Sequence, residues 1–178
     1  MGKTGTKGKE IAMRFDIPLK PQNASRPNFN SQGQAPRAFM QKKYRDWRHE
    51  FDKWFNDWLE ETNARIFKEL MFLNGHIDDL DYLYRNSHGR LKPEFEGWSF
   101  NIVFVIERPK SVDRGFPVSG GDLDNYAKAV IDGIFENPIA KMNRLNDKFI
   151  QDLHVTKRYT WLDSDEKPHI EVEVNMIG

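Results

Sequence analysis

The chain has 178 residues, with 27 Lys and Arg, 27 Asp and Glu, and no cysteine. The lack of cysteine excludes disulfides, thiolate metal centres and cysteine nucleophiles. No apolar run reaches the ~20 residues of a membrane-spanning helix, and no apolar signal-peptide core follows the first residue, so we expect a cytoplasmic protein with no membrane partner.

The charges are unevenly distributed along the chain. Residues 1–48 hold eleven Lys and Arg against three Asp and Glu, so the remainder has an excess of acid. This asymmetry indicates contact with a polyanion at one place and metal-holding carboxylates at another. A solvated basic arm without a partner is the alternative.

The first part of the chain predicts a tail, a strand, a loop and a helix. Residues 1–10, rich in Gly, Lys and Thr, are expected to form a disordered basic tail ahead of one domain over 11–178. An apolar pattern predicts a strand over 11–19, and the Asn, Ser, Gly and Pro of 21–36 are typical of a loop. From Pro36 an aromatic stripe at 3–4 spacing predicts a long helix. We interpret the stripe as a core face, with a nucleic-acid surface as the weaker alternative.

The middle of the chain predicts a second helix and a strong strand. Residues 66–73 have a helical pattern, and the acids within 76–81 are interpreted as a solvated turn rather than a metal cluster. Apolar residues on both alternations of 98–106 predict a central strand that is covered on both faces. Residues 108–121 are a basic loop with two prolines and three glycines, suited to gripping a phosphodiester or simply to connecting strand and helix.

An amphipathic helix is predicted directly after this loop, over 122–135. Asp122 stands at its N-cap position, and its polar face carries Asp124, Lys128 and Asp132, each one turn from the last. Two carboxylates held close together repel each other unless a cation lies between them, and carboxylate oxygens are what Mg²⁺ requires. A capping aspartate followed by an Asp–Lys–Asp surface ladder is the alternative.

The C-terminal part predicts two strands after a turn. Residues 145–148 form the turn, 149–159 the first strand, and 170–176 a final strand with one apolar and one polar face. The whole chain therefore predicts a single α+β domain in the order β-α-β-α-β-β. Its mixed β-sheet is packed by helices on one side.

The predicted helix start carries a recognisable motif. Residues 122–125 read Asp-Leu-Asp-Asn, with Lys128 and Asp132 behind them. This stretch resembles the RusA family of Holliday junction resolvases, whose pattern is D-L-D-N-x-x-K-x-x-x-D on a helix that follows a strand and a basic loop. A short acidic turn then opens a strand in the family, and residues 145–152 match it.

The resemblance does not cover the chain evenly. It is close from about 98 to 176 and looser before that, where the first strand with its Pro-x-x-Pro-x-Asn exit (Pro18 to Asn23) and the long helix are similar to the family. Residues from about 59 to 96 look like an insertion into the RusA-like domain.

The resemblance implies an endonuclease that cuts four-way DNA junctions as a homodimer with Mg²⁺, for which Mn²⁺ can substitute. It would act in the cytoplasm, or in the host cytoplasm if phage-encoded. Carried onto the matching positions, it implies three metal-binding catalytic acids and a catalytic lysine: Asp122, Asp124, Asp147 and Lys128. Asp132 and Asn125 are expected to support them.

Basic residues around the acids are expected to contact DNA: Arg108, Lys110, Arg114, Lys157 and Arg158. Two positions depart from the family pattern, because Asn146 stands where a second acid is common and Phe149 where a Gln is common. These departures leave two alternatives open: a metal nuclease acting on branched or flap DNA in general, and a catalytically weakened junction-binding protein.

Overall fold

The computed structural model describes residues 12–25, 28–30, 37–61, 97–118, 120–142 and 146–177. The predicted tail over 1–10 lies outside these residues. So does the predicted insertion beyond residue 61, with the helix and the acidic turn expected within it.

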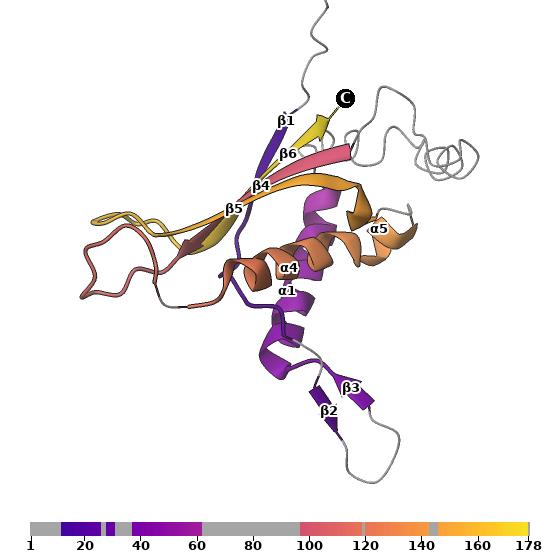
Figure 1. The fold of residues 1–178 in the computed structure, drawn as a ribbon, viewed down its shortest axis with the longest axis horizontal. Helices are drawn as coiled ribbons and strands as arrows, with labels where there is room; N and C mark the ends of the chain where they lie inside the picture. Colours follow the sequence, from indigo (N-terminus) through magenta and orange to yellow (C-terminus); the bar gives the residue numbers. More distant parts are fainter. Residues whose placement is uncertain are drawn as a thin grey trace, which may run out of the picture.

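The core of the fold is a four-stranded mixed sheet (Figure 1). Its strands are β1 (Ala12–Ile17), β4 (Gly97–Ile106), β5 (Ile150–Tyr159) and β6 (His169–Ile177), arranged in the order β1-β6-β4-β5. β4 and β5 are parallel, and the other neighbours are antiparallel. The predicted α+β fold with a mixed sheet is therefore confirmed.

Helices cover one side of this sheet (Figure 1). They are α1 (Lys42–Glu60), α4 (Leu123–Phe135) and the short α5 (Pro138–Met142), followed by a 3₁₀ turn, η3 (Asp147–Phe149). The predicted order β-α-β-α-β-β holds for the main elements, with the short elements added between them.

The long helix starts later than predicted. Its expected first turn is instead the strand β3 (Arg37–Phe39), which pairs with β2 (Asn28–Asn30) in a small antiparallel sheet. The prediction of helix from Pro36 and of loop throughout 21–36 was wrong here, because pairing between the two short segments outweighs their local sequence preferences.

The aromatic stripe of α1 is a core face, as predicted. Tyr44, Trp47, Phe51, Phe55 and Trp58 are all buried, and Phe51 and Phe55 are essentially inaccessible. Buried aromatic side chains remove a large apolar area from water, so this face anchors the helix to the sheet.

The strand β4 is central but is not covered equally on its two faces. Its helix-facing residues Trp98, Phe100, Ile102 and Phe104 are buried. On the other face Asn101 and the residues beside it stay partly exposed, next to polar side chains of β1 and β6. The expectation of cover on both faces was therefore wrong for the described residues: all the described helices lie on one side.

The crossover from β4 through α4 to β5 fixes where the polar residues of α4 lie. Because β4 and β5 are parallel, α4 runs back along the sheet between them (Figure 1). The start of α4 lies at the C-terminal ends of both strands, where the Lys157 ammonium donates to the Gly121 carbonyl at 3.2 Å. The end of α4 lies near the start of β5.

Candidate metal and nucleic-acid site

The first turn of α4 presents two exposed carboxylates. Asp122 occupies the N-cap position with φ −73° and ψ 144°, but its side chain makes no capping hydrogen bond. Asp124 lies in the first turn and is exposed as well. Neither carboxylate has a hydrogen bond or ion pair within the described residues. The N-cap position is confirmed, whereas capping by the carboxylate does not explain why an acid stands there.

The polar ladder along α4 exists only in its second half. The Lys128 ammonium lies 2.9 Å from a carboxylate oxygen of Asp132, and the hydrogen bond to Asp132 is the main cause that raises the pKa of Lys128. The Lys128 side chain is 61% exposed and that of Asp132 only 16%. Asp132 therefore orients Lys128, which stays charged and exposed to solvent one turn from Asp124. Asp124 itself makes no hydrogen bond or ion pair with these two residues.

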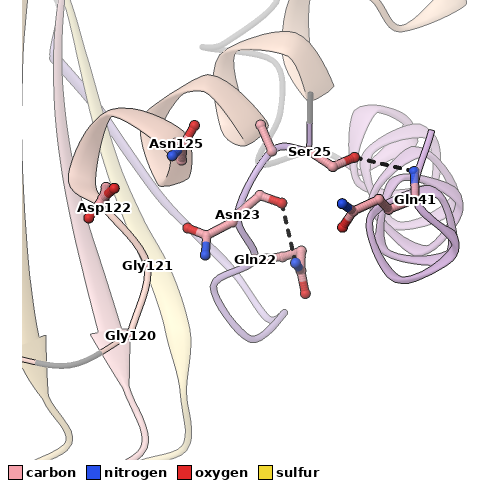
Figure 2. A pocket seen from close by; sticks show the side chains of 9 residues that line it. Gln22, Asn23, Ser25, Gln41, Gly120, Gly121, Asp122 and Asn125 are labelled. Carbon is pink, nitrogen blue, oxygen red and sulfur yellow. Dashed lines mark hydrogen bonds between the residues drawn. The ribbon is translucent and has the colours of Figure 1, made fainter. Parts of the chain in front are cut away.

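A polar pocket of about 550 Å³ opens beside the start of α4 (Figure 2). Its lining comes from the β1–β2 loop, the start of α1 and the start of α4: Gln22, Asn23, Ala24, Ser25, Gln41, Gly120, Gly121, Asp122 and Asn125. Most of these residues offer amide, hydroxyl or carboxylate groups. Such a pocket suits a hydrated or charged ligand better than an apolar one.

The β1–β2 loop lies close against the start of α4 at the wall of this pocket. The Ala24 amide donates to the Asn125 carbonyl at 3.0 Å, and the Gly121 amide donates to the Tyr126 hydroxyl at 3.0 Å. A Cβ atom on Gly121 would lie 1.8 Å from Asn23 Oδ1, so only glycine allows this approach. That oxygen is buried and has no hydrogen-bond partner within the described part of the chain.

The groups at this helix start fit a hard cation by their chemistry. Two unpaired carboxylates and the Asn125 side chain lie in or beside a polar pocket with room for water. Mg²⁺ prefers one or two carboxylates together with several waters. Asp122 and Asp124 are thus the residues that would hold such an ion, with Asn125 next to them.

Asp147 lies at the other end of α4. It begins η3, just before β5, and lines a separate pocket with Ile131 and Leu153. At about 1.5 Å per residue, the 13 residues of α4 separate the start of the helix from that end. Among the described residues, Asp122, Asp124 and Asp147 therefore do not form one group of possible metal ligands, and their assignment to a shared metal site stays a prediction.

Two of the predicted DNA-binding arginines are engaged with the protein itself. Arg108 donates to the carbonyls of Thr160, Val112 and Arg114 and so fastens the loop that leads to α4. Arg158 donates to both carboxylate oxygens of Glu166 and to Glu171.

The other three predicted DNA-binding residues remain available. Lys110 and Arg114 are exposed, and no ion pair within the described residues involves them. Lys157 reaches only the Gly121 carbonyl, so its charge lies beside the acids at the start of α4. These three residues place positive charge at that end of the sheet.

The structure also shows a group of side chains that the sequence analysis missed. Ligand atoms of Glu166, His169 and Glu171 lie within 4.8 Å of one another, all partly buried. His169 and Glu171 lie two residues apart on β6, a spacing from which the sequence could have predicted that they share a face of the strand. Glu166 lies in the turn before β6, and its position could not be predicted from the sequence. The guanidinium of Arg158 already neutralises both glutamates.

Comparisons with known proteins add no identification. No protein-family model matches the chain, and no curated protein matches it. Among the described residues, no helix is both long enough and apolar enough to cross a membrane.

Proposed function

We propose that this protein is a Mg²⁺-dependent endonuclease that resolves four-way DNA junctions by hydrolysing phosphodiester bonds. One observation carries the proposal: the first turn of α4 exposes two carboxylates without protein partners beside a polar pocket. Unpaired acids that neither cap the helix nor join the ladder are accounted for by a cation. The Asp-Leu-Asp-Asn motif with Lys128 directs the proposal to junction resolvases.

The acids and the lysine of the site have separate roles. Asp122 and Asp124 bind Mg²⁺, helped by the partial positive charge of the helix start, which favours ionised acids there. Mg²⁺ supplies activation of water and neutralises charge on the phosphate and the leaving oxygen. Lys128, oriented by Asp132, offers a positive charge to the phosphate oxygens where negative charge develops.

Positively charged residues outside the pocket hold the DNA backbone. Lys110 and Arg114 lie on the loop that precedes α4, and Lys157 lies at the end of β5. Their contacts are with phosphates, so they position the substrate and make its binding sensitive to salt.

A junction-binding protein with weakened catalysis is the second candidate. The observation that favours it is the position of Asp147, which a single chain does not bring to the other two acids. Loss of the third ligand weakens a metal site while leaving the positive surface in place.

Cleavage of a synthetic four-way junction tests the proposal. We expect the wild-type protein to cut it only when Mg²⁺ or Mn²⁺ is present, and Asp122→Asn or Asp124→Asn to lower cleavage by at least ~10²-fold, the loss typical of removing a key charge-stabilising group. A gel shift should show that both variants still bind the junction. Asp57→Asn, an exposed acid near the far end of α1, makes the same charge change and should cut like wild type.

The outcomes separate the candidates. Full cleavage by Asp124→Asn overturns the assignment of the site. Binding without cleavage by the wild-type protein supports the second candidate. Equal cutting of forked or flap DNA would make the protein a general branched-DNA nuclease, and failure to bind any branched DNA would reject all of these functions.

A further inference from the structure

The four most exposed large apolar side chains of the described residues lie on two neighbouring segments. Phe116 and Val118 belong to the loop before α4, and Trp161 and Leu162 belong to the turn between β5 and β6; they are 63%, 66%, 61% and 55% exposed. Both segments project beyond the same end of the sheet (Figure 1). Large apolar side chains that gather at one place on a surface mark a candidate binding site.

The fold holds these two segments side by side. The Tyr159 amide donates to the Gly115 carbonyl at 3.0 Å, which ties the loop to the end of β5. Pro117 is buried, so the loop is anchored on both sides of Phe116. Phe116 is therefore exposed beside the turn that carries Trp161, while the backbone around it is held in place.

The Trp161 ring is fixed in position as well. The guanidinium of Arg158 lies over the ring, 4.4 Å from its centroid, and is itself held by Glu166 and Glu171. The Trp161 amide donates to Glu166 at 2.7 Å, and the Trp161 carbonyl accepts from Ser164 Oγ at 2.9 Å. Because Trp161 is still 61% exposed with one ring face covered, its other face is open to solvent.

A tryptophan ring with one open face suits a flat ring as its ligand. Nucleobases stack on aromatic side chains with little regard to sequence, because every base has a π-face. A side chain that is already positioned loses little conformational freedom on binding, so more of the stacking contributes to affinity.

The charges of the two segments indicate where phosphates and bases would lie. Residues 108–121 hold three basic residues and one acid, and the Lys110 and Arg114 side chains are exposed. The turn between β5 and β6 carries the exposed acids Asp163 and Asp165, which repel phosphates. Phosphates are therefore expected along the loop, and a base is expected at Trp161.

We propose that an aromatic platform, Trp161 together with Phe116, stacks on unpaired bases at the branch point of DNA and makes the protein prefer branched to linear DNA. This inference rests on the proposed function. Bases inside a duplex are stacked on their neighbours, and exposing one costs least where it is mismatched or already unpaired. The Lys157 ammonium donates to the Gly121 carbonyl beside Asp122, so the platform and the acids lie at the same end of the sheet.

Binding of two synthetic four-way junctions tests the platform. One junction is fully paired and the other has mismatched bases beside the branch point; fluorescence anisotropy in EDTA measures affinity without cleavage. We expect wild type to prefer the mismatched junction. Trp161→Leu keeps an apolar side chain but removes the π-face, so its affinity for that junction should fall by ~10-fold, a loss typical of one stacked base.

Two further variants serve as controls for this measurement. Trp161→Phe restores an aromatic ring and should keep most of the affinity. Leu162→Ala removes an exposed apolar side chain from the same turn and should bind like wild type. Circular dichroism should be unchanged in each variant, because the backbone hydrogen bonds of the turn do not depend on these side chains.

The dependence of affinity on salt separates stacking from attraction to phosphates. Trp161→Leu should lower the affinity without changing the slope of its logarithm against the logarithm of the salt concentration. Arg114→Ala should reduce that slope by about 1, because it removes one phosphate contact. A slope reduced by Trp161→Leu to the same extent would overturn stacking.

Tryptophan fluorescence gives a direct readout. Trp161 is the only exposed residue among the five tryptophans, since Trp47, Trp58 and Trp98 are buried and Trp54 is half-buried. Iodide at constant ionic strength should therefore quench mainly Trp161. The mismatched junction should protect Trp161 from iodide more than a linear duplex does, and equal quenching with and without the junction would overturn the contact.

Failure of this inference and failure of the proposed function are distinguishable. If wild type cuts the junction with Mg²⁺ but Trp161→Leu binds as tightly as wild type, the platform is overturned and the nuclease stands. If wild type binds through Trp161 without cutting, the nuclease is rejected and the platform stands. An equal loss for Leu162→Ala and Trp161→Leu would indicate a general apolar docking surface and overturn stacking on bases.

Discussion

The two ends of α4 have opposite characters. At its end the helix is fully packed: Ile134 is inaccessible, and the ring of Phe51 lies so close to Gly133 that a Cβ atom there would be 2.8 Å away. At its start Asp122 and Asp124 are exposed and have no partner within the described residues. One end of this helix therefore serves stability, and we propose that the other, where the acids lack protein partners, serves binding.

Alanine substitution of one glycine near each end of α4 should separate the two roles with the largest effects. At the start of α4, Gly121→Ala places a Cβ atom 1.8 Å from Asn23 Oδ1 and forces the pocket wall to move. We expect junction cleavage to fall by ~10²-fold, because small misplacements of catalytic groups are costly. Cleavage kinetics measure this. Adding Asn23→Ala removes the clashing atoms and should recover the stability lost by the single variant, measured by urea unfolding.

At the packed end, Gly133→Ala should act on stability instead. Its added methyl group meets the Phe51 ring, and overpacking of this kind costs about 1–3 kcal/mol. Urea unfolding should show that loss, while cleavage per folded molecule stays near wild type. Gly115→Ala is the matched control, because nothing lies within 4 Å of its Cβ position. Because Gly→Ala inside a helix otherwise gains about 0.5–1 kcal/mol, an increase in the free energy of unfolding by that amount for Gly133→Ala would contradict the close packing of α1 on α4.

A buried polar residue at the packed end tests the role of that end in stability. Asn137 is buried, donates to the side chains of Asp52 and Asn56, and accepts from the Ile139 amide. Asn137→Ala leaves these partners unsatisfied, and we expect the free energy of unfolding to fall by ~1–3 kcal/mol. Asn146→Ala removes a hydrogen bond that is exposed, so its loss in the same urea titration should be smaller.

The smallest effect that we expect is a pH-dependent change in stability from the ion pair at the turn between β5 and β6. The Arg158 guanidinium holds the pKa of Glu166 below its usual 4.5. A lowered pKa means that the folded state favours the ionised carboxylate, so its stabilisation is complete above pH 4.5 and is lost as the pH falls through the lower folded value.

Urea midpoints of wild type and Glu166→Gln at neutral and acidic pH measure this effect. The difference between the two urea midpoints should decrease as the pH falls. Glu50→Gln, an exposed acid on α1, should show no such narrowing. A constant difference for Glu166→Gln across the titration would mean that the ion pair does not stabilise the fold.

Local patterns in the sequence predicted the main elements and the position of the acids on α4. The aromatic spacing of α1 predicted its buried face, and the alternation in β4 and β6 predicted strands, because burial of one face imposes these periods. The glycine pair followed by Asp122 and an apolar helical pattern predicted where α4 begins. These features depend only on residues a few positions apart in the chain, so local sequence patterns were enough to predict them.

Contacts between distant segments decided the rest. The pairing of β2 with β3 replaced the expected first turn of α1, and the engagement of Arg108 and Arg158 with distant backbone and glutamates was not readable from their charge alone. The direction of α4 between two parallel strands separated Asp147 from the acids with which the motif had grouped it. Spacing along the chain fixes which residue types are present, but only the tertiary structure fixes which of them meet, because a crossover can carry sequence neighbours to opposite ends of a sheet.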